Sequence, residues 1–126
     1  GIGDIKYSLL YLLFQKLYEG LEDQVDSTAE KIMGTLDAKA VDIFLHLDLF
    51  KTLIKNFISI DDKFKLSEVE CIQKALVAEK AFRVLSEKLK LTLEEDKKMS
   101  LGWDDLIAAN YSASESRSYL LSQSLE

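Results

Sequence analysis

The single histidine of this chain, His46, follows Asp42 by four residues in the stretch DIFLHLDLF. Side chains four residues apart share one face of an α-helix, so the Asp42 carboxylate would lie beside the imidazole. Such a pair favours the charged imidazole and can serve as a base, a metal ligand or a weak pH-responsive contact. The leucines around His46 favour a different role, at the edge of a hydrophobic core. We expect the core role and keep Asp42 and His46 as candidates for a pocket or a pH response.

Metal binding and nucleophilic catalysis have little support elsewhere in the sequence. Zinc sites use several Cys and His ligands, and this chain has one of each, Cys71 and His46, without ligand spacing between them. Cys71 lies near the start of an expected helix, which gives a thiol some thiolate character, but His46 is its partner only by default. A buried cysteine is the commoner outcome. We therefore predict no catalytic residue, no metal and no cofactor.

Phosphate and acid–base sites are also unsupported. A phosphate-binding loop needs closely spaced glycines, and no two internal glycines of this chain are close. Carboxylates occur in adjacent pairs, such as Asp104 and Asp105, and neighbours on a helix point about 100° apart. These pairs are typical of helix starts, where negative charge is favoured by the helix dipole.

The composition predicts an all-α fold that positions these residues. The chain has no proline, and its 126 residues, 48% of them hydrophobic, suffice for one core. We expect one helical domain over residues 1–126, with five to seven helices in a bundle or an orthogonal array. Four cap patterns mark expected helix starts: Ser27–Glu30, Ser67–Glu70, Thr92–Glu95 and Ser112–Glu115.

Apolar periodicity places the expected helices in the first half of the chain. The first helix runs from Asp4 to Gly20, where glycine is a typical C-terminal stop. A short helix near 27–35 and a long one near 37–59, which contains His46, follow it.

In the second half, a helix is expected from Ser67 to about Leu91, then an interruption near 100–102 and a short helix over 104–109. Residues 112–126 form either a weak polar helix or a frayed serine-rich end. The expected core contacts of this half are Ile72, Ala75, Leu76, Phe82, Leu85, Leu89, Trp103, Leu106, Ile107, Leu121 and Leu125, with Ala78 or Glu79 at the margin.

The first expected helix is apolar on two sides. Four aromatic residues, spaced by four, three and four positions from Tyr7 to Tyr18, form a stripe on one side of this helix. A stripe of isoleucine and leucine lies roughly on the opposite side. Either its own chain covers this helix on all sides, or one stripe contacts a partner; a membrane-surface helix would need a wider polar face than Lys6 and Lys16 provide. Tyrosine suits interfaces because it buries apolar area and keeps its hydroxyl wet. The interface candidates are Tyr7, Tyr11, Phe14 and Tyr18.

Charge and hydropathy restrict the partners. The net charge of −6 disfavours nucleic acid, which is bound mostly by Lys and Arg, and no apolar run approaches the ~20 residues of a transmembrane helix. We expect an acidic, cytoplasmic, non-catalytic interaction or regulatory protein. It would act through self-association, most simply as a homodimer, or bind another protein through the aromatic face of its first helix. The alternative is a helical module that holds an apolar small molecule or lipid in the bundle core.

Overall fold

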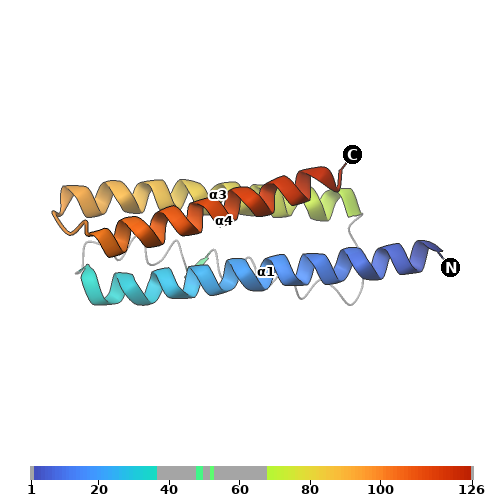
Figure 1. The fold of residues 1–126 in the computed structure, drawn as a ribbon, viewed down its shortest axis with the longest axis horizontal. Helices are drawn as coiled ribbons and strands as arrows, with labels where there is room; N and C mark the ends of the chain where they lie inside the picture. Colours follow the sequence, from blue (N-terminus) through green and yellow to red (C-terminus); the bar gives the residue numbers. More distant parts are fainter. Residues whose placement is uncertain (1, 37–47, 50–51, 53–67, 126) are drawn as a thin grey trace.

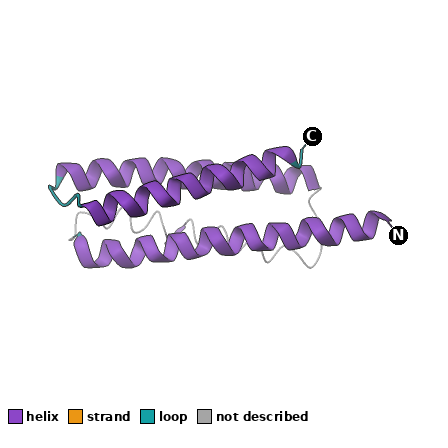
Figure 2. Ribbon diagram, in the orientation of Figure 1, coloured by secondary structure: helices purple, strands orange, loops and turns teal. Residues whose placement is uncertain are grey.

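The computed structural model describes residues 2–36, 48–49, 52 and 68–125, and for residues 2–14 it describes the backbone alone. These residues contain three long helices, α1 (Ile2–Thr35), α3 (Glu68–Glu95) and α4 (Leu101–Gln123) (Figure 1). The described chain is therefore all-helical, with short loops and no strand (Figure 2). None of the described helices has the length and apolarity needed to cross a membrane.

The three helices lie lengthwise beside one another, and α4 runs antiparallel to both α1 and α3 (Figure 1). The start of α4 contacts the end of α1, where Trp103 Nε1 donates to Thr35 Oγ1 at 3.1 Å. Further along α4, Arg117 reaches back to Gln24 of α1. Because α3 and α4 are joined by a tight turn, α1 and α3 run in the same direction.

The core is formed by one stripe of buried residues on each helix, which we call a seam. Along each seam, successive buried residues are three or four positions apart in the sequence. This seven-residue repeat is the packing pattern of coiled coils and helical bundles. Every described residue that is classed as buried lies on a seam: Tyr18, Leu21, Val25, Thr28 and Ile32 of α1; Ile72, Ala75, Glu79, Phe82, Ser86, Leu89 and Leu93 of α3; Trp103, Ile107, Asn110, Ser114, Arg117 and Leu121 of α4.

The expected number of helices, five to seven, is wrong for the described residues, which contain three longer ones. The predicted stop at Gly20 does not occur, because the seam continues through Leu21 and Val25. Burying these two side chains outweighs the cost of a glycine in a helix, about 1 kcal/mol. The expected long helix over 37–59 lies largely outside the described residues.

Three predicted cap patterns also lie inside helices. Ser27 is inside α1, so the short helix expected near 27–35 is part of this longer helix. Thr92 is in α3, and its hydroxyl donates to the Lys88 carbonyl oxygen at 3.0 Å, which is a contact of helix interiors. Ser112 is inside α4, which continues to Gln123.

An interruption is present, but it lies over residues 96–100, earlier than the expected 100–102, and the short helix expected over 104–109 is part of the longer α4. Ser100 caps α4 by accepting a hydrogen bond from the Trp103 N–H at 3.1 Å.

The turn between α3 and α4 contains a residue in the left-handed region, Lys97, with φ of 56°. The Lys98 N–H donates to the Leu93 carbonyl at 2.8 Å, and the Lys97 N–H donates to the Glu94 carbonyl at 3.2 Å. This pair of bonds defines a Schellman motif, whose left-handed position is usually glycine because a side chain is strained there.

We therefore expect Lys97→Gly to raise the free energy of unfolding by about 1 kcal/mol, since it relieves the left-handed strain. Urea denaturation followed by circular dichroism measures the change. Lys97→Ala is the matched control, because it removes the lysine side chain but keeps the strain, and it should give no such gain. Equal effects of the two substitutions would contradict this explanation.

Candidate functional site

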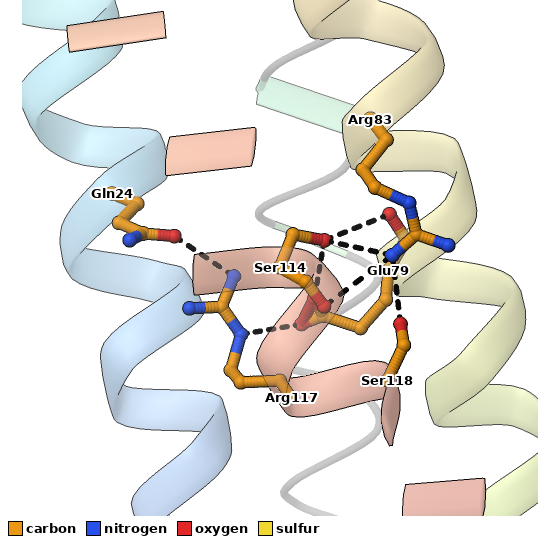
Figure 3. Close-up of polar contacts among 6 residues, drawn as sticks. All are labelled: Gln24, Glu79, Arg83, Ser114, Arg117 and Ser118. Atoms are coloured by element: carbon orange, nitrogen blue, oxygen red, sulfur yellow. Dashed lines mark hydrogen bonds and ion pairs between the residues drawn. The ribbon is translucent and has the colours of Figure 1, made fainter. Parts of the chain in front are cut away.

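A buried carboxylate lies at the centre of the three helices. Glu79 of α3 is 3% exposed, and Arg117 of α4 is 8% exposed. Arg117 Nε donates to Glu79 Oε1 at 2.8 Å, and Ser114 Oγ donates to Glu79 Oε2 at 2.6 Å (Figure 3). Both carboxylate oxygens therefore accept a hydrogen bond inside the core, one of them from a positive charge.

The same cluster extends to α1 and to a second arginine. Arg117 Nη2 donates to Gln24 Oε1 of α1 at 2.8 Å (Figure 3). Half-buried Arg83 of α3 donates from Nη1 to Ser114 Oγ at 3.0 Å and to Ser118 Oγ at 2.7 Å. We call these six residues the polar network: Gln24, Glu79, Arg83, Ser114, Arg117 and Ser118.

Two further polar contacts join α1 to α4 along the seam. Asn110 Nδ2 donates to Thr28 Oγ1 at 2.9 Å, and this hydroxyl donates to the Gln24 carbonyl at 2.7 Å. At the C-terminal end of α1, the Trp103 indole N–H donates to Thr35 Oγ1. Lys31 Nζ lies 5.3 Å from the centre of the Trp103 ring. Polar side chains of α1 and α4 are thus paired at three levels, at Thr35, Thr28 and Gln24 of α1.

Tyr18 borders the polar network. Burial raises the pKa of its phenol far above the ordinary value, and the negative charge of Glu79 adds to the effect, followed by that of Cys71. A cavity of about 10 Å³ lies here, lined by Leu17, Tyr18, Leu21, Ala75, Glu79 and Leu121. A space of this size holds about one water molecule. The cavity is too small for a lipid or another organic ligand.

The carboxylate of the polar network is hydrogen-bonded within its own chain. It is enclosed by α1, α3 and α4, and its oxygens are occupied by donors of the same chain. A general acid or base must instead reach a substrate atom within hydrogen-bond distance. A buried ion pair adds little net stability compared with apolar packing. Removing one partner is costly, however, because it leaves an unpaired charge in the core, so the pair disfavours helix arrangements that would separate its members. We interpret the polar network as the device that fixes the relative positions of the helices.

The structure describes only some of the residues that the sequence singled out. Tyr18 is 5% exposed and packs within its own chain, so a partner surface on α1 would form without it. Cys71 is half-buried on α3. Asp42 and His46 lie outside the described residues. Tyr7, Tyr11 and Phe14 lie in the part of α1 for which the backbone alone is described.

The residues that sequence reasoning missed are those of the polar network. Glu79 was expected at the margin of the core, and it is buried inside it. Arg117 and Ser114 are in a stretch that looks polar and solvated. Their spacing from Trp103, Ile107 and Leu121, in steps of three and four, is the signal that places them on the seam.

Among the described residues, no group of three or more His, Cys, Asp or Glu side chains is arranged to hold a metal ion. Comparison with protein families, with curated proteins and with solved structures finds no match.

Removing one partner of the buried ion pair should destabilise the protein more than removing both. We expect Arg117→Met to lower the free energy of unfolding by about 3–5 kcal/mol, because Glu79 loses its charged partner inside the core. The double variant Glu79→Leu/Arg117→Met should recover most of that loss. Chemical denaturation measures both, and exposed Glu94→Gln on α3 should leave stability unchanged. A double variant less stable than Arg117→Met would contradict this role.

Tyr18 should make stability fall at alkaline pH. A tyrosine in the unfolded chain loses its proton near pH 10, whereas buried Tyr18 keeps it because its pKa is raised in the folded state. The contribution of Tyr18 to the free energy of unfolding is therefore complete below about pH 10, and it is lost as the pH rises further. Above about pH 10, the free energy of unfolding should fall more steeply for the wild type than for Tyr18→Phe. Exposed Tyr119→Phe is the control, and identical slopes for all three proteins would disprove the assignment.

Proposed function

We propose that this chain is a non-catalytic helical-bundle protein that acts by association, binding a second copy or another protein through residues 2–14 of α1. The observation that supports this proposal is the continuation of the α1 seam beyond the buried core. Stepping back from Tyr18 by four, three and four residues leads to Phe14, Tyr11 and Tyr7. The backbone of these residues is helical, so they lie on the side of α1 that faces the core further along.

The other two described helices are shorter at this end. The cavity brings Tyr18, Ala75 and Leu121 to one level. From Leu121, α4 continues for two residues, about 3 Å, to its C-terminal end, and from Ala75, α3 continues for seven residues, about 10 Å, to its N-terminal end. From Tyr18, α1 continues for sixteen residues, about 24 Å, to its N-terminal end. The N-terminal turns of α1 accordingly extend past α3 and α4 (Figure 1).

The chemistry of this extension fits a protein partner. A seam with a seven-residue repeat is complementary to another helix, and tyrosine is among the residue types that most often dominate the binding energy of protein interfaces. Tyrosine adds a hydroxyl that can remain hydrated at the rim. The alternative function, binding of an apolar small molecule or lipid, gains no support from the water-sized cavity between the described helices.

We expect a triple variant, Tyr7→Ser, Tyr11→Ser and Phe14→Ser, to lower the mass measured by sedimentation at high protein concentration, because three apolar contacts of the interface are lost. The matched control is Tyr119→Ser, since Tyr119 is an exposed aromatic residue of α4. This variant should keep the wild-type mass. A wild-type protein that stays monomeric at every concentration, with the triple variant identical to it, would exclude self-association through α1.

A further inference from the structure

We draw no further inference here: the strongest candidate, the side-chain cluster in which Lys31 of α1 lies over the Trp103 ring beside the N-terminus of α4, rests on a helix N-terminus alone, and nothing at the described residues around it points to a ligand.

Discussion

The burial of one carboxylate constrains the arrangement of all three described helices. Seams that repeat every seven residues can in general slide past one another by one repeat and still bury apolar side chains. Here such a slide would separate Glu79 from Arg117 and leave a charge in the core without its partner, at a cost of several kcal/mol. It would also separate Asn110 from Thr28. The apolar positions thus make association of the helices favourable, and the polar positions select one register among those that the apolar positions allow.

This arrangement also determines where recognition can occur. The interior described for α1, α3 and α4 is filled by side chains, its charged groups are paired within the chain, and its cavity holds about one water molecule. We propose that the chain instead binds its partner through residues 2–14, where α1 runs past α3 and α4 (Figure 1).

The all-helical class and much of the apolar core were predictable from composition and periodicity, as Trp103, Ile107 and Phe82 show. The helix ends were less predictable, because cap patterns and a glycine also occur inside helices when tertiary packing favours continuation, as at Gly20. The polar network was not predicted, since the burial of Glu79 depends on Arg117, 38 residues further along. Local patterns do not reveal which distant helix will supply a partner.

The sequence separations within the polar network have a consequence for folding order. Arg117 and Glu79 belong to adjacent helices joined by a tight turn, whereas Gln24 and Arg117 are 93 residues apart. Closing a short loop costs less entropy, so the α3–α4 hairpin should assemble first and α1 should dock on it afterwards. During synthesis, however, α1 leaves the ribosome long before α4 exists. The apolar seam of α1 is then synthesised before the helices that cover it, and transiently exposed apolar surface of this kind favours aggregation.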